Sequence, residues 1–239
     1  MSLPKISHPI ISVEVPSTKK TYRFRPFLVK EEKILLMAKS SEEPTDILAA
    51  IKQVINNCAL DPLFYVNQIA IFDLEYIFLK LRAASIDNSI KVSYRDAEDQ
   101  KIYDFEVDLD KVAMVFPAAA DANNKIAISK TAGIVLNYPP ASLYDDKKFL
   151  DTGESEIMFE LISRCIAQVY DGDKVYLAKD YKPEEMMEFV ENLDVKTYAA
   201  IDNFLKNAPK MEHVLKYTNS LGTAKTISLT TLSDFFTLR

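Results

Sequence analysis

The scarcity of glycine restricts the folds and sites open to this chain more than any other single feature. Its 239 residues include only four glycines, at positions 133, 153, 172 and 222. Nucleotide-binding loops that wrap a phosphate with backbone N–H groups use several clustered glycines, because only glycine lets the backbone approach so closely. No such cluster exists here, so the sequence argues against a P-loop or Rossmann-type enzyme.

Two β-hairpins are predicted in the first half of the chain, because apolar and polar residues alternate in paired segments. The paired segments are residues 10–15 with 21–25, and residues 90–94 with 102–109. Pro26 lacks a backbone donor and steers Arg25 away from the helical conformation, so the first hairpin ends there.

Helical periodicity predicts three helices between these hairpins. The first begins near Val29 and faces an apolar stripe inward, with Glu31 among the charged residues on the solvent side. The second begins with Thr45 as its N-cap. The third spans residues 72–84, and its predicted buried stripe is Leu74, Ile77, Phe78 and Leu81.

The second half of the chain is predicted to be more helical. Apolar residues at spacings of three and four predict a long helix over residues 154–170, and two shorter helices follow. The remaining predicted elements are helices 184–192 and 195–206, short strands 125–128, 133–138 and 175–177, a last hairpin from residues 214–217 and 226–229, and a closing segment 232–236.

These elements predict an α+β fold with an N-terminal β-hairpin and helices, a central hairpin, and a helical second half with a C-terminal β-hairpin. Residues 1–116 form the predicted N-terminal α+β region, and residues 117–130 are the predicted linker because they begin with an aperiodic stretch rich in Ala and Asn. Residues 131–239 form the predicted mainly helical region. The length suits one large domain or two small ones.

Charge and hydrophobicity limit the partners. The formal net charge is −6 and no basic stretch is apparent, which disfavours nucleic acid as a partner. No apolar run is long enough to cross a membrane, and the N-terminus lacks the apolar core of a signal peptide. Cys58 and Cys165 are isolated within apolar patterns, which is typical of buried thiols in a reducing compartment. We therefore expect a cytosolic location and no membrane partner.

The sequence offers few residues that could form a catalytic or metal site. Only His8 and His213 could serve as a catalytic imidazole, and two distant histidines with two distant cysteines do not form a zinc site. The acidic residues 104, 106, 108 and 110 alternate with apolar ones, which is more typical of a solvated strand face than of a divalent cation site. The sequence predicts no catalytic, cofactor-binding or metal-ligating residue, hence no cofactor and no enzyme.

Two motifs carry a resemblance to a known family. They are RPFLVKEEKILLMA, Arg25 to Ala38, and FDLEYIFLKLRAAS, Phe72 to Ser85. Both resemble the N-terminal signature of the T-even-type bacteriophage baseplate hub assembly protein family, and the resemblance covers mainly the first 116 residues. It implies a non-enzymatic phage protein required for assembly of the tail baseplate hub, acting by protein–protein binding as an assembly factor or chaperone.

The resemblance also implies where to look for a partner. The baseplate hub proteins are the expected partners, in the host cell cytoplasm during phage assembly and possibly in the virion. A permanent structural subunit of the baseplate is the alternative, and an enzyme acting on nucleic acid or cell wall is a distant one. The candidate family-motif and partner positions are Arg25, Phe27, Glu31, Phe72, Asp73, Glu75 and Arg82.

Three finer expectations follow. Arg25 is expected to pair with a carboxylate, either Glu31, Glu32 or Asp73. The strands within residues 125–138 are the expected edge for a client strand. Many family members are expected to carry a C-x-x-C pair in the last hairpin, but residues 217–222 contain no cysteine here, which puts any family metal in doubt.

Overall fold

The computed structural model describes residues 7–41, 44–118, 123–146, 149, 153 and 156–235. The predicted helix start at Glu154 and the closing Phe236 lie outside these residues. The chain divides into two compact units, unit 1 (residues 1–115 and 210–239) and unit 2 (residues 116–209).

Unit 1 begins with a β-hairpin followed by three helices, as the sequence predicts. The strands β1 (Ile11–Glu14) and β2 (Thr21–Phe24) pair antiparallel. The helices are α1 (Val29–Ser41), α2 (Pro44–Cys58) and α3 (Ile71–Ser85), with a 3-10 turn η1 (Val66–Gln68) before α3. Pro26 separates β2 from α1, and the predicted start of α1 at Val29 is confirmed.

Two further hairpins complete unit 1. The central one is β3 (Ser89–Arg95) with β4 (Ile102–Asp108), and it is confirmed. The other pairs β10 (Lys210–Thr218) with β11 (Ala224–Leu229), and β10 also pairs with β5 (Ala113–Val115). The short elements are η2 (Leu109–Lys111) and α8 (Leu232–Phe235).

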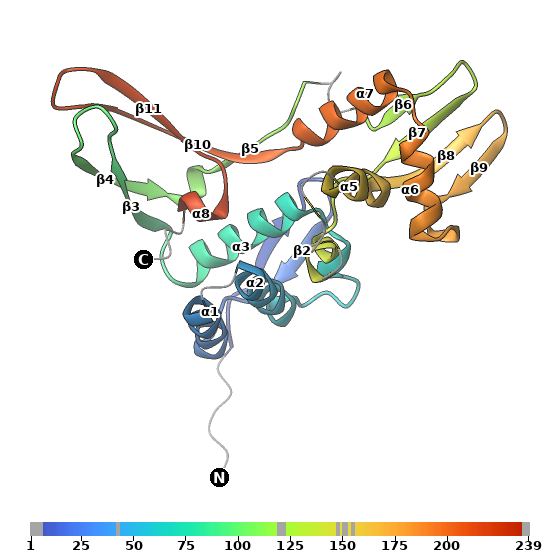
Figure 1. Ribbon diagram of the computed structural model, residues 1–239. Helices are drawn as coiled ribbons and strands as arrows, with labels where there is room; N and C mark the ends of the chain where they lie inside the picture. Colours follow the sequence, from blue (N-terminus) through green and yellow to red (C-terminus); the bar gives the residue numbers. More distant parts are fainter. Residues whose placement is uncertain are drawn as a thin grey trace, which may run out of the picture. The chain divides into compact units, whose positions relative to one another are not determined.

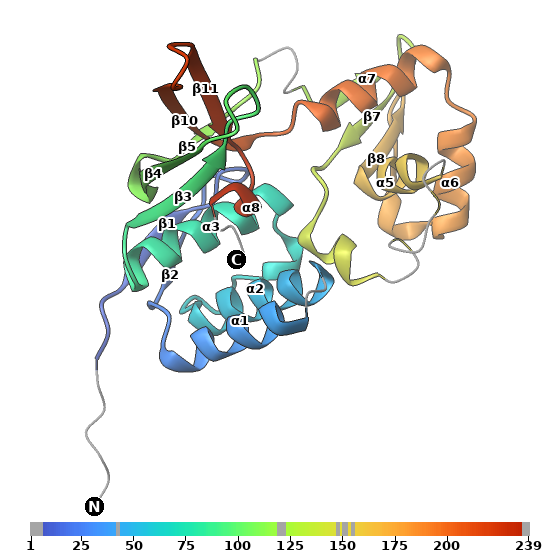
Figure 2. The ribbon, with the colours of Figure 1, turned by 60° about the vertical axis from the view of Figure 1, so that its left-hand side comes forward.

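Helix α3 lies between the α1–α2 pair on one side and the β3–β4 and β10–β11 hairpins on the other, as both ribbon views show (Figures 1 and 2). The predicted stripe of Leu74, Ile77, Phe78 and Leu81 is buried. Leu79, on the side facing the hairpins, packs in a core cluster with residues of β3, β4, β10 and β11. The helix is therefore buried on more than one side, which explains its almost continuous apolar sequence.

The tips of the two hairpins are joined by polar side chains. Tyr217 Oη donates to Asp96 Oδ2 at 2.6 Å, and the backbone N–H of Ser220 donates to Asp99 Oδ2 at 2.9 Å. Glu98 pairs with Lys225 at 2.6 Å. These contacts join residues more than 115 positions apart in the sequence and fix the last hairpin on unit 1.

The predicted division into consecutive regions therefore differs from the observed units. It assigns residues 210–239 to the second region, whereas β10 returns to unit 1 and pairs with β5. The predicted linker also contains a strand, Lys125–Ala127, which belongs to the sheet of unit 2. Local sequence patterns do not reveal strand pairing between distant segments. The predicted regions are therefore consecutive stretches of the chain.

Unit 2 is a four-stranded antiparallel sheet with helices. Its strand order is β6-β7-β8-β9, formed by β6 (Lys125–Ala127), β7 (Ala132–Leu136), β8 (Ile166–Asp171) and β9 (Lys174–Leu177). Its helices are α5 (Ile157–Cys165), α6 (Pro183–Glu191) and α7 (Val195–Lys206), with 3-10 turns η3 (Ala141–Asp145) and η4 (Ala178–Asp180). The core joins β7 residues such as Ile134 to Ile162 and Phe204 from the helices.

One predicted helix is wrong over its last five residues. The helix expected over residues 154–170 ends at Cys165, and Ile166–Asp171 form β8 instead. Short apolar runs rich in β-branched and aromatic residues fit a helix or a buried strand equally well by periodicity. Here the strand is stabilised by pairing with β7 on one side and β9 on the other. The α+β class is confirmed, but the second half holds more sheet than predicted.

No helix within the described ranges is long and apolar enough to cross a membrane.

Candidate protein-interaction site

A buried ion pair fixes the start of α1. Arg25 donates from Nη2 to Glu31 Oε1 at 3.0 Å and from Nη1 to Glu31 Oε2 at 3.1 Å. Glu31 is completely buried and also accepts from the backbone N–H of Leu28 at 3.0 Å. Burial opposes ionisation of Glu31, but Arg25 and the Leu28 N–H outweigh it and hold the pKa of Glu31 below its ordinary value.

The same guanidinium connects three elements. Arg25, which follows β2, also donates to the carbonyl of Asn57 in α2 at 2.9 Å and to that of Pro26 at 3.0 Å. The predicted pairing of Arg25 with a carboxylate is thus confirmed, with Glu31 as the partner. The predicted solvent-facing position of Glu31 is wrong, because the pair with Arg25 lets this carboxylate be buried.

A second buried carboxylate fixes α3. Asp73 is completely buried and accepts from the backbone N–H of Ser17 at 2.9 Å and from the backbone N–H of Ala70 at 3.2 Å. Ser17 lies in the turn between β1 and β2, so Asp73 attaches the first hairpin to the start of α3. Burial raises the pKa of Asp73, and the hydrogen bonds from Ser17 and Ala70 counteract part of that rise.

Two further carboxylates fix the start of helix α8, and one of them joins it to α3. Asp234 accepts from the backbone N–H groups of Thr230 at 2.8 Å and Thr231 at 2.9 Å. Glu75 on α3 is partly buried and accepts a backbone hydrogen bond from Leu232. Burial raises the pKa of Glu75 to about 7; the Leu232 bond opposes this rise and the charge of Asp234 adds to it.

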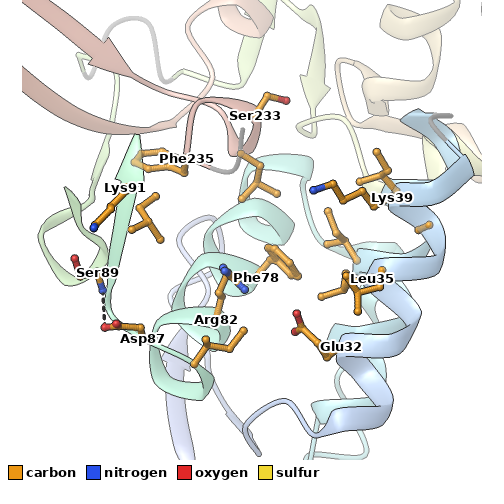
Figure 3. A pocket seen from close by; sticks show the side chains of 17 residues that line it. Glu32, Leu35, Lys39, Phe78, Arg82, Asp87, Ser89, Lys91, Ser233 and Phe235 are labelled. Atoms are coloured by element: carbon orange, nitrogen blue, oxygen red, sulfur yellow. Dashed lines mark hydrogen bonds between the residues drawn. The ribbon is translucent and has the colours of Figure 1, made fainter. Parts of the chain in front are cut away.

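These anchored elements enclose a groove of about 540 Å³, all within unit 1 (Figure 3). We call it the α1–α3 groove. Its lining is mainly apolar, with charged and polar side chains interspersed. The apolar lining residues are Leu35, Leu36, Ala38, Ile47, Ile51, Phe78, Ile86, Ile90, Leu232 and Phe235. The polar ones are Glu32, Lys39, Arg82, Asp87, Ser89, Lys91 and Ser233.

Figure 3 shows how the sides face one another. Glu32 and Leu35 from α1 point towards Phe78 and Arg82 from α3 across the space between the two helices. On α1, the groove residue Leu36 is 57% exposed, and its chain neighbour Met37 is 66% exposed. A groove lined mainly by apolar side chains, with charged ones among them, has the composition of a protein-binding surface.

Of the seven motif positions, only Arg82 lines the groove. Phe27 packs against Phe78 with ring centroids 5.6 Å apart, and its N–H donates to Ser85 Oγ at 2.8 Å. Phe72 is buried. The anchoring contacts described above involve four more of the motif positions, Arg25, Glu31, Asp73 and Glu75. These residues hold the helices around the groove in place and do not line it. Their contact with a partner stays a prediction.

Sequence reasoning missed most of the groove. Ile86, Ile90, Leu232 and Phe235 come from segments far apart in the chain, and no local pattern connects them. One signal was present: the four consecutive apolar residues at positions 34–37 cannot all face inward on a helix of 3.6 residues per turn.

The rest of the described chain offers little for catalysis or metal binding. No group of three or more His, Cys, Asp or Glu side chains within the described residues is arranged to hold a metal ion. Burial raises the pKa of the Cys58 thiol to about 11 and that of Cys165 to about 12, which disfavours the reactive thiolates. The α1–α3 groove is the candidate site that the described residues support best.

Fold and groove thus define an α+β protein with a groove lined mainly by apolar side chains. The chain matches the family described as T4 bacteriophage base plate protein over residues 8–237, nearly its whole length, and it belongs to that family. It is a phage baseplate protein, as the two motifs implied. No curated protein and no solved structure matches it significantly.

Proposed function

We propose that this baseplate protein is a non-enzymatic assembly factor of the tail baseplate hub, and that it binds a hub protein through the α1–α3 groove. It acts in the host cell cytoplasm while tails are being assembled. The observation that carries the proposal is the mainly apolar lining of the groove together with the exposed Leu36 and Met37 on α1.

Apolar side chains gathered at a folded surface support a binding role, because contiguous exposed apolar patches mark interaction sites in proteins that otherwise bury such residues. The patch on α1 does not result from a loosely placed helix. Helix α1 is fixed by the buried pair of Arg25 and Glu31, so the face that carries Leu36 is presented in a defined position. A preformed surface reduces the entropy lost on binding.

The test uses a matched pair of variants. Leu36→Glu places a charge on the exposed apolar surface of the groove, and Leu63→Glu makes the same change at a residue that is 72% exposed and is not among the groove residues. Tagged chains are expressed in cells infected with a phage that lacks the gene. Wild type and Leu63→Glu should restore hub assembly and co-purify with hub proteins, whereas Leu36→Glu should fold but fail in both. Equal rescue by Leu36→Glu would contradict a role for the groove.

The copy number of the protein in purified, infectious virions separates an assembly factor from a permanent structural subunit. An assembly factor leaves, so mature virions should lack the chain, and adding it after hubs are complete should not rescue tails. A fixed copy number per virion would replace the assembly-factor proposal with the structural-subunit alternative, in which the groove holds its neighbour permanently.

A further inference from the structure

Strand β9 is an edge strand with an unusually exposed sequence. It pairs with β8 on one side and lies at the end of the strand order β6-β7-β8-β9. All four of its residues are exposed, including Val175 at 56% and Leu177 at 37%. Edge strands in stable proteins usually carry charges or prolines that prevent pairing with other chains. Here the only charged residue is Lys174, at the start of the strand.

The strand register determines which backbone groups are available. Asp171 and Lys174 close the β8–β9 hairpin as partners on either side of a two-residue turn, and Val169 pairs with Tyr176. In an antiparallel ladder, hydrogen-bonded pairs alternate with pairs that are not bonded to each other. The N–H and C=O groups of Lys174 and Tyr176 therefore point to β8, and those of Val175 and Leu177 point away from the sheet.

We infer that this edge binds the same edge of a second copy of the chain, antiparallel and around a two-fold axis at Tyr176. In this register Val175 lies opposite Leu177 of the second copy, so the outward N–H and C=O groups of both residues bond across the axis. The same pairing places Val175 and Leu177 side chains together on one face, and the two Tyr176 rings together on the other. The two sheets then form one continuous antiparallel sheet.

Charge favours a second copy over an unrelated strand. Asp173 lies in the turn before β9 and Lys179 in η4 just after it, so antiparallel pairing brings the end of one strand that carries Asp173 to the end of the other that carries Lys179. The symmetry brings these ends together twice. Neither Asp173 nor Lys179 has an ion pair within the described part of the chain. Within β9 the residues that pair across the axis, Val175, Tyr176 and Leu177, are all uncharged, so the strand pairing itself sets no like charges opposite each other. A strand that complements its own sequence in this way satisfies the requirement of a two-fold interface.

The interface is short, so the dimer should be weak and depend on concentration. Proteins with small contact areas associate transiently in dilute solution. A baseplate protein gathered at an assembling hub would experience a far higher local concentration than in solution, which allows a weak contact to form there.

The decisive variant is Val175→Pro, with Val175→Thr as its control. Proline removes the outward N–H of Val175 without breaking a β8–β9 hydrogen bond, and edge strands tolerate proline at such a position. Threonine keeps both the N–H and the β-branched shape. By sedimentation equilibrium of the full chain, wild type and Val175→Thr should form dimers with similar dissociation constants, and Val175→Pro should raise the constant by about tenfold or more, because each copy loses a donor.

Charge exchange tests the register independently of the proline. Asp173→Lys alone should weaken the dimer, and the double variant with Lys179→Asp should restore it, since the two charges have only exchanged places. Wild-type protein that stays monomeric up to millimolar concentration would overturn the inference, as would a double variant no tighter than Asp173→Lys. Residues of the α1–α3 groove are unchanged in all these variants, so loss of the dimer with intact hub assembly would leave the proposed function standing.

Discussion

Arg25 holds both carboxylate oxygens of Glu31, at 3.0 and 3.1 Å, while Glu31 is completely removed from solvent. The pair is asymmetric, because the Arg25 side chain keeps 16% of its surface exposed. Without Arg25, the buried Glu31 carboxylate must either stay charged with only the Leu28 N–H and the exposed Lys30 ammonium beside it, or take up a proton, and both cost free energy.

We therefore expect Arg25→Ala to lower the free energy of unfolding by about 3 kcal/mol, in the range seen when one partner of a buried pair is lost. Arg23→Ala is the matched control. Arg23 also pairs with a carboxylate, since its Nη2 donates to Asp61 Oδ1 at 2.6 Å, but its side chain is 58% exposed. Exposed pairs contribute little to stability, so Arg23→Ala should cost much less than Arg25→Ala. Urea denaturation measures both, and a loss below about 0.5 kcal/mol for Arg25→Ala would show an ordinary surface residue.

The stability of unit 1 should fall between pH 4.5 and 7 because of Glu75. Its pKa rises from 4.5 to about 7 on folding, so the folded state binds the proton more tightly than the unfolded state in this window. The stabilisation from Glu75 is complete below pH 4.5 and is lost as the pH rises to 7. At about 1.4 kcal/mol per pKa unit, the loss is on the order of 3 kcal/mol.

Glu75→Gln should remove this pH dependence, because the amide carries no charge and its oxygen still accepts from the Leu232 N–H. Urea midpoints at pH 5 and pH 8 test it. The variant should match wild type at pH 5 and exceed it at pH 8. A variant that keeps the wild-type difference between the two pH values would show that another group causes it.

Gly133→Ala should destabilise unit 2. A Cβ at Gly133 in β7 would lie 2.3 Å from Tyr170 Oη and 2.6 Å from the backbone oxygen of Ile126, and the latter cannot move without breaking the β6–β7 pairing. Overpacking of this kind costs about 1–3 kcal/mol. Gly153→Ala is the control, since a Cβ there meets nothing within 4 Å. Thermal unfolding that is unchanged in Gly133→Ala would contradict this close packing.

Cys58 and Cys165 should resist thiol reagents in the native protein. Both are buried, and burial raises their pKa to about 11 and about 12, so little thiolate exists at neutral pH. An aromatic disulfide reagent at pH 8 should label neither residue in native protein within minutes and both in urea. Rapid native labelling of one cysteine would show that its surroundings open readily.

The sequence predicted the local elements of unit 1 well, because their amphipathic patterns are regular. Leu74, Ile77 and Leu81 on α3 follow the helical period and are buried as expected. Ile166–Tyr170 also fits that period, yet pairing with β7 and β9 makes it a strand. Local periodicity carries no information about such long-range strand pairing.

The candidate site was less predictable than the fold. The motif positions were recognisable in the sequence, but Glu31 and Asp73 are buried and hold α1 and α3 in place instead of lining the groove. The groove itself depends on α8, whose Leu232 and Phe235 arrive from the end of the described chain. A site formed by distant segments is specified by tertiary packing, so the spacing of residues along the chain could not locate it.

The return of the chain to unit 1 has a consequence for synthesis on the ribosome. Val115 and Lys210 are paired neighbours in the β5–β10 ladder, so unit 2 begins and ends at adjacent points of one sheet. All of unit 2 is translated before β10, the middle strand of that sheet, becomes available. Domains generally fold as units during translation, so this sheet, and helix α8 after it, are completed last. Because Leu232, Ser233 and Phe235 of α8 line the groove, the groove is complete only after residue 235 has been made.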